Sequence, residues 1–256
     1  MTKIEWCDEV YNPVTGCTPI SEGCQNCYAK RMANRLKGRY GYPVDDPFRV
    51  TFHPERLDQP LKWKKPRRIF VGSMGDLFHQ KIDVDSSIYS SIFQIIRKCP
   101  QHTFMILTKR PGKMKWVFKH SFTELPNLWL GVTAENQEQA DERIPILLQI
   151  PAAVRFVSVE PLLSNIDLTK YLNRDKPQET INMEAPSLNW VICGAETGPG
   201  ARVTDDFWIR LLRDQCQEAG VQFFMKKVSG KRPIPDDLNV REFPVRYVGA
   251  EPKGGE

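Results

Sequence analysis

Three of the seven cysteines lie close together in one short stretch, and they constrain the protein more than any other feature. Cys17, Cys24 and Cys27 follow the spacing C-x6-C-x2-C. A free cysteine is usually an isolated buried residue, so three in one segment indicate a bound soft metal or an iron–sulfur cluster. Residues 28–37 have apolar side chains at helical spacing. We therefore expect the cysteines on a loop that leads into a helix N-terminus, where bound negative charge is favoured.

The number of cysteines leaves several kinds of site open. A structural zinc ion takes four ligands, and Cys7 could supply the fourth. A [4Fe–4S] cluster held by three cysteines leaves one iron free to bind another molecule. A disulfide is disfavoured, because the cysteine count is odd and residues 1–8 lack the apolar core of a secretion signal. The other cysteines are scattered and are expected to pack in the core: Cys99, Cys193 and Cys216.

The composition is typical of a globular protein with a full core, because 41% of the 256 residues are hydrophobic. No segment approaches the apolar length that spans a membrane. We therefore expect a cytoplasmic protein that does not associate with membranes. The formal net charge of +5 neither demands nor excludes an acidic partner.

Short apolar runs alternate with helical segments along most of the chain. The expected strands are residues 11–16, 68–73, 103–108, 128–133, 154–159, 188–193 and 221–225. The expected helices include residues 86–97, 136–149, where Pro145 should kink or shorten the helix, and 204–220, capped by Thr204. Continuous apolar strands separated by helices are typical of a buried parallel sheet. The predicted fold class is therefore α/β, as a partial (β/α)6-type barrel or a doubly wound open sheet.

The barrel is expected to occupy residues 1–228. Within it, residues 38–66 are irregular and rich in Pro and Arg, which predicts an insertion over the first helix. Residues 173–187 are polar and should form a surface loop. Residues 229–256 read as a C-terminal extension that ends in a disordered tail.

Charged residues follow the expected strands at the point where each one ends. They are Asp76, Lys109, Glu135, Glu160, Glu196 and Lys226. In a parallel barrel the carboxyl ends of all strands meet at one edge, which we call the mouth. These side chains should therefore converge beside the cysteine loop. Six separate segments agree, which favours a common functional site over strands that merely end in solvent.

The cysteine loop, followed by an aromatic residue and a helix, resembles the loop of radical S-adenosylmethionine (SAM) enzymes. Their first cysteine spacing is usually three residues, whereas it is six here. The resemblance implies a partial barrel of the radical SAM kind, a [4Fe–4S] cluster on the three cysteines and SAM on the open iron. SAM would meet the strand ends, and the candidate cofactor-binding residues are Asn26, Tyr28, Gly72, Ser73, Met74, Gly75, Asp76, Thr108, Glu135 and Gly194. The candidate catalytic residues are Glu160, Lys109 and Glu196.

Further motifs extend this resemblance over residues 4–228. They are Trp6 and residues 12–17, 23–29, 75–78, 107–111, 129–133, 158–162 and 194–198. Together they resemble a phage and bacterial family of three-cysteine-motif proteins that is described as radical-SAM-like. That resemblance implies an enzyme with an unknown substrate, supplied with electrons by a reductant such as flavodoxin or ferredoxin.

Three stretches mix basic and aromatic residues: 62–68, 109–119 and 226–232. Such stretches can follow phosphates and stack on bases. Two of them follow strand ends, so a nucleotide or a nucleic acid is a candidate substrate. His79 is the histidine expected near the mouth, where it could carry protons. The alternative function is a non-catalytic zinc module that binds nucleic acid, with the metal on Cys7, Cys17, Cys24 and Cys27.

Overall fold

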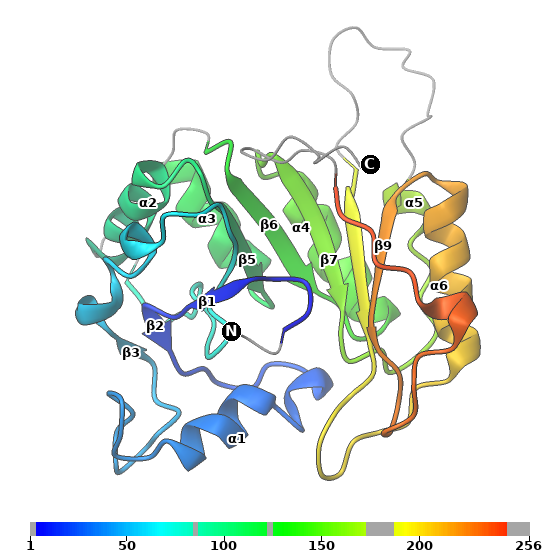
Figure 1. The fold of residues 1–256 in the computed structure, drawn as a ribbon, viewed down its shortest axis with the longest axis horizontal. Helices are drawn as coiled ribbons and strands as arrows, with labels where there is room; N and C mark the ends of the chain where they lie inside the picture. The colour runs from blue at the N-terminus through cyan, green and yellow to red at the C-terminus, as the bar shows by residue number, and fades with distance from the viewer. Residues whose placement is uncertain (1–3, 84–86, 122–124, 173–186, 245–256) are drawn as a thin grey trace, which may run out of the picture.

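The computed structural model of the chain describes residues 4–83, 87–121, 125–172 and 187–244. Within these residues, seven parallel strands form one sheet in the order β1-β4-β5-β6-β7-β8-β9, curled into a half-barrel (Figure 1). The strands are β1 (Glu9–Tyr11), β4 (Arg68–Val71), β5 (Thr103–Thr108), β6 (Leu128–Thr133), β7 (Val154–Val159), β8 (Trp190–Gly194) and β9 (Gln222–Lys227). A separate antiparallel pair joins β2 (Val14–Thr15) to β3 (Thr51–Phe52).

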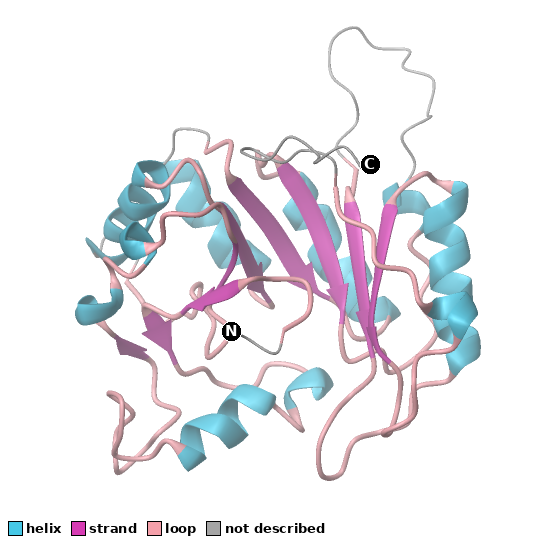
Figure 2. Ribbon diagram, in the orientation of Figure 1, coloured by secondary structure: helices cyan, strands magenta, loops and turns pink. Residues whose placement is uncertain are grey.

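The helices that connect the strands lie on the outer face of the half-barrel (Figure 2). They are α2 (Ser87–Lys98), α3 (Pro111–Ser121), α4 (Gln137–Leu148), α5 (Thr169–Leu172) and α6 (Asp206–Glu218). The remaining helix, α1 (Tyr28–Arg35), lies apart from them, near the carboxyl ends of the strands (Figure 1). Short 3-10 turns are η1 (Glu22–Cys24), η2 (Pro54–Arg56), η3 (Pro60–Lys62) and η4 (Asp236–Leu238). The α/β partial barrel is thus confirmed, and the doubly wound alternative is wrong, because helices cover one face only.

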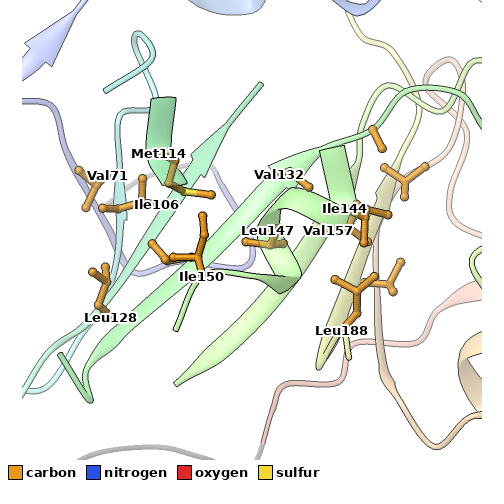
Figure 3. Close-up of a cluster of buried hydrophobic side chains, with 14 of the residues drawn as sticks. Val71, Ile106, Met114, Leu128, Val132, Ile144, Leu147, Ile150, Val157 and Leu188 are labelled. Atoms are coloured by element: carbon orange, nitrogen blue, oxygen red, sulfur yellow. The ribbon is translucent and has the colours of Figure 1, made fainter. Parts of the chain in front are cut away.

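The main core lies between the sheet and the outer helices. Alternate residues of each strand, such as Ile106, Val132 and Val157, belong to one buried cluster with Ile144 and Leu147 of α4 (Figure 3). All five side chains are completely buried. Burying an aliphatic side chain of this size contributes about 1.5–3 kcal/mol, so this layer holds the half-barrel in its curved shape.

The inner face of the sheet is filled by aromatic side chains toward the amino ends of the strands. Trp129, Phe156 and Trp190 pack there against Trp6, which precedes β1. The C-terminal segment closes this end, because the Phe243 ring packs against Trp190 in a tilted arrangement, with 5.4 Å between ring centroids. The polar strand ends are left at the opposite edge.

Several sequence expectations need correction. The first strand ends at Tyr11, and the rest of the expected strand forms β2 in the small sheet. Pro145 does not shorten its helix, since α4 continues to Leu148. Asp205, not Thr204, caps α6, because its carboxylate accepts from the Phe207 amide at 2.9 Å while the Thr204 hydroxyl donates to Leu162. Helix α3 falls in a stretch that was interpreted only as basic.

The expected insertion at residues 38–66 packs over α1, where Tyr42 and Phe48 contact Ala29 and Ala33. Residues 173–186, nearly all of the expected surface loop, lie outside the described residues, as does the tail at 245–256. None of the helices in the described part of the chain has the length and apolar character needed to cross a membrane.

Candidate functional site

The cysteine loop, residues 17–27, is attached to the mouth at the end of β4. Gly16 forms a bridge with Gly75, and its amide donates to the carbonyl of Met74 at 2.9 Å. A Cβ atom on Gly75 would lie 2.7 Å from the Gly16 carbonyl oxygen. Only glycine lets the two backbones approach this closely, so residues 72–76 position the first cysteine.

The turn after β4 is fixed by a second contact from the N-terminal segment. The Asn12 side chain accepts from the Met74 amide at 2.9 Å and pairs with the Ser73 hydroxyl at 3.0 Å. Gly72 has a φ of +85°, a conformation that favours glycine. Gly72 and Ser73 therefore owe their placement to the turn itself, and Ser73 is already engaged by a protein group.

Arg110, just past β5, joins the loop to the mouth. Its Nη1 atom lies 3.2 Å from Cys17 Sγ and 3.0 Å from Asp76 Oδ2. Its Nη2 atom donates to the Thr18 carbonyl at 2.8 Å. Burial raises the pKa of the Cys17 thiol to about 11, and Asp76 adds to the rise, while Arg110 acts against both. Among the described residues, the Arg110 guanidinium is the one cationic group that contacts the Cys17 sulfur.

Asp76 is buried, and both of its carboxylate oxygens accept hydrogen bonds from protein donors. One carboxylate oxygen accepts from the Phe78 amide at 2.9 Å and the Thr108 hydroxyl at 2.7 Å. The other accepts from the Lys109 amide at 3.3 Å and from Arg110. An ammonium group would have to compete with these four donors, so the geometry suits Asp76 to anchoring Arg110 better than to binding SAM directly.

Glu135, at the end of β6, is completely buried and supports the middle of the loop. It accepts from Arg143 at 3.0 Å and from the Gly23 amide at 3.4 Å, and Lys109 lies 3.8 Å away. Burial alone would raise the pKa of Glu135, but Lys109, a hydrogen bond from Ser21 and Arg143 outweigh it and hold the pKa below its usual range. Glu135 is therefore an ionised support for the loop.

Glu196, after β8, binds the last part of the loop. Its Oε2 accepts from Asn26 at 3.0 Å, and Arg202 reaches both oxygens, at 2.6 and 3.0 Å. These bonds, with Arg202 first among them, lower the pKa of Glu196 to about 2. A carboxylate with this pKa is a poor proton donor near neutral pH. The side-chain amide of Asn26 donates hydrogen bonds to Glu196 and to the Gly200 carbonyl, so both of its donors are already used.

Glu160 and Lys226 form a further pair at the ends of β7 and β9. Both side chains keep about a quarter of their surface exposed, unlike Asp76 and Glu135. Gly194 lies beside them, since a Cβ atom there would be 3.3 Å from the Glu160 side chain. Of the predicted catalytic residues, Glu160 is the one with a charged partner and open access to the mouth.

The seven cysteines are all free and divide into two groups. Cys17, Cys24 and Cys27 are partly exposed, whereas the other four are buried. Cys7 packs in the aromatic cluster with Trp6, and burial raises its pKa to about 12. Cys17 and Cys27 contact the cluster around α1 instead. The structure therefore places Cys7 in a different cluster from Cys17 and Cys27.

The chemistry of the loop thiols suits a three-cysteine metal centre, because they are free, partly exposed and close in sequence. Cys24 is also near enough to Cys17 to act on its pKa. Yet in the described part of the chain no three His, Cys, Asp or Glu side chains are arranged so that they could hold a metal ion. Ligation requires the three side chains to turn toward a common centre.

Two predicted residues lie at the edge of this network. Tyr28 is 54% exposed, so its ring is free to contact a ligand. His79 is buried and lies 2.8 Å from the Thr18 hydroxyl through Nε2, while its Nδ1 accepts from the Lys81 amide. His79 therefore holds Thr18 in place, and burial, with help from Arg110, lowers its pKa.

Sequence reasoning missed the arginines that pair with the predicted acids: Arg110, Arg143 and Arg202. Each acid was found because it follows a strand directly. The sequence positions of Arg143 and Arg202 give no comparable indication. Arg110 does, because it comes two residues after Thr108 and lies within the motif at residues 107–111.

Comparison with known proteins identifies a family whose model matches this chain. The model of a family described as "Protein of unknown function (DUF5131)" matches residues 1–242. No curated protein matches the chain, and no solved structure matches it.

Proposed function

The chain belongs to the DUF5131 family, and from its own geometry we propose that it is a radical SAM enzyme. Cys17, Cys24 and Cys27 would hold a [4Fe–4S] cluster, with SAM as the second cofactor. The observation that carries the proposal is the docking of the cysteine loop on the mouth of a parallel half-barrel, through contacts to residues that follow β4, β5, β6 and β8.

When bound, the cluster and SAM supply an electron and a 5′-deoxyadenosyl radical for hydrogen abstraction. The chain supplies position and charge. Arg110 holds Cys17 and Thr18 against the end of β5, Glu135 holds Gly23, and Glu196 holds Asn26. These contacts fix three points of one loop, as a site that must place ligands within a fraction of an ångström requires.

The substrate would lie on the inner side of the mouth, where side chains are small. Thr133, Ser158 and Gly194 face the interior at the level above the aromatic cluster. Glu160 and Lys226 flank this level and keep access to solvent. We assign these two residues to substrate binding, with Lys226 suited to an anionic group and Glu160 to a hydroxyl or amine.

We propose further that the protein acts in the cytoplasm and receives electrons from a one-electron reductant such as flavodoxin or ferredoxin. The test is anaerobic reconstitution with iron and sulfide, followed by SAM and dithionite. We expect a brown protein with about four irons per chain, and release of methionine and 5′-deoxyadenosine. A colourless protein would contradict the proposal.

Two matched variants sharpen the test. Cys24→Ser should lose the iron, because a loop ligand is removed. Cys7→Ser should keep it, because Cys7 packs in the aromatic cluster. Zinc in place of iron, lost equally from both variants, would favour the zinc module.

A further inference from the structure

We propose that the outer surface of α1 and the loop after it binds single-stranded nucleic acid. We call it the α1 surface, and it consists of Tyr28, Lys30, Arg35, Lys37, Arg39 and Tyr40. All six residues are exposed. None of these side chains belongs to the loop that carries the cysteines, although Tyr28 directly follows Cys27 and is also a candidate for the cofactor site. The other five residues carry the proposal independently of the metal centre.

The segment that carries the α1 surface is basic. Residues 25–44 contain five basic residues and no Asp or Glu. The whole chain has 36 basic and 31 acidic residues, so this segment is more basic than the chain as a whole. Residues 59–75 and 107–123 have the same count, so charge favours a polyanionic partner here but does not by itself single out the α1 surface.

These cations are also not neutralised by the fold. No ion pair is recorded for Lys30, Arg35, Lys37 or Arg39 among the described residues, and the one side-chain bond of Arg39 goes to a backbone carbonyl. The basic stretches singled out from the sequence differ in part, because several of their cations are paired. Arg110 pairs with Asp76, Lys226 with Glu160, and Arg67 and Arg68 with Glu9 and Asp8.

Two exposed tyrosine rings lie at the ends of the cationic row. Tyr40 is 74% exposed and has a φ of +52°, which a residue other than glycine rarely adopts. Its backbone is held by Arg56, whose Nη2 donates to the Tyr40 carbonyl at 2.5 Å. The fold thus fixes a ring outside the core, beside unpaired cations. Cations flanked by exposed aromatic rings can bind the phosphates of a single strand and stack on its bases.

An anionic membrane is a poorer match to the same surface. A helix that lies on a membrane needs a free apolar face. The apolar face of α1 is used, since Ala29 and Ala33 are buried against Tyr42 and Phe48. A duplex is also a poorer match, because its base faces are stacked on one another and cannot reach Tyr40.

The test is fluorescence polarisation of the full chain with a labelled 12-nucleotide single strand of mixed sequence. We expect binding whose log Kd changes with log salt with a slope of about 3, as four neutralised phosphates of a single strand give. The quadruple variant K30Q/R35Q/K37Q/R39Q should bind at least tenfold more weakly and with a slope near zero.

A matched control removes four other exposed cations: K62Q/K64Q/K65Q/K98Q. It should bind like the parent chain, and an equal loss in both variants would overturn the proposal. Tyr40→Asn keeps a side chain that tolerates positive φ and should weaken binding about tenfold through lost stacking. Unchanged affinity in that variant, equal affinity for a duplex, or equal affinity for anionic vesicles would each overturn it.

Cys24→Ser should leave oligonucleotide binding intact. Binding by a chain that takes up no iron would therefore support the α1 surface while refuting the proposed function. A chain that assembles the cluster and ignores the oligonucleotide would do the reverse.

Discussion

Arg110 and Cys17 meet at the mouth of the half-barrel, with Nη1 of the arginine 3.2 Å from the sulfur of the cysteine. The same nitrogen lies 3.0 Å from Asp76, and both charged side chains are nearly buried. The first cysteine of the loop is therefore tied to a buried ion pair at the end of β5. The stability of the fold and the position of a candidate metal ligand depend on the same contact.

Arg110→Ala should destabilise the protein by about 3–5 kcal/mol, because it leaves Asp76 charged and buried without its partner. Urea unfolding at pH 7 measures the change. The double variant D76A/R110A should lose much less than the sum of the two single changes, because it removes both charges together. Simple additivity would show that the two side chains have no interaction energy and would contradict the assignment.

Glu196 should make stability depend on acid pH. Its pKa is lowered from 4.5 to about 2, so its contribution is complete above pH 4.5 and is lost as the pH falls toward 2. Glu196→Gln should cost about 2 kcal/mol near neutral pH, after allowance for the solvent that reaches Arg202. The difference between parent and variant should shrink by more than half by pH 3. Parallel unfolding curves from pH 6 to 3 would contradict the assignment.

Three of the strands that are buried on both faces were predicted to the residue. Residues 103–108, 128–133 and 154–159 are mainly apolar because most of their positions pack on either the helices or the aromatic cluster. Helix α3 was missed because its exposed lysines dominate its composition, although Met114 and Val117 are buried at helical spacing.

The candidate site was predicted only in part, because the role of each residue depends on contacts between distant segments. Glu135 and Glu196 come just after a strand, and Asp76 lies on the turn that follows β4, so chain order alone places these acids at the mouth. What each acid does depends on a partner from another segment or from a loop, such as Arg143 for Glu135. No local sequence pattern predicts such a pair. Only the fold shows that these carboxylates already accept hydrogen bonds from protein groups.

Gly75 should tolerate no side chain. A Cβ atom there would lie 2.7 Å from the carbonyl oxygen of Gly16 and 2.8 Å from its nitrogen, and these backbone atoms cannot move without shifting the cysteine loop. We expect Gly75→Ala to cost about 1–3 kcal/mol and to reduce iron uptake. Gly112→Ala is the control, since no atom lies within 4 Å of its Cβ position and it is in a helix. It should be neutral or stabilising by up to about 1 kcal/mol.

Alkylation should distinguish the loop thiols from the core thiols. In the metal-free protein at pH 8, iodoacetamide should label Cys24 and Cys27 first and Cys17 more slowly, because burial raises the pKa of Cys17 to about 11. The buried cysteines should remain unlabelled until the protein unfolds: Cys7, Cys99, Cys193 and Cys216.

Mass spectrometry of the peptides measures each site separately, and the reconstituted protein provides the comparison. Loading with iron and sulfide should protect Cys17, Cys24 and Cys27 together, since a shared cluster engages all three sulfurs. Cys99 is the internal control, because its burial in the main core is independent of the loop. Protection of two loop cysteines while the third stays reactive would mean that the loop does not hold the cluster through three sulfurs, and the proposed site would need another ligand.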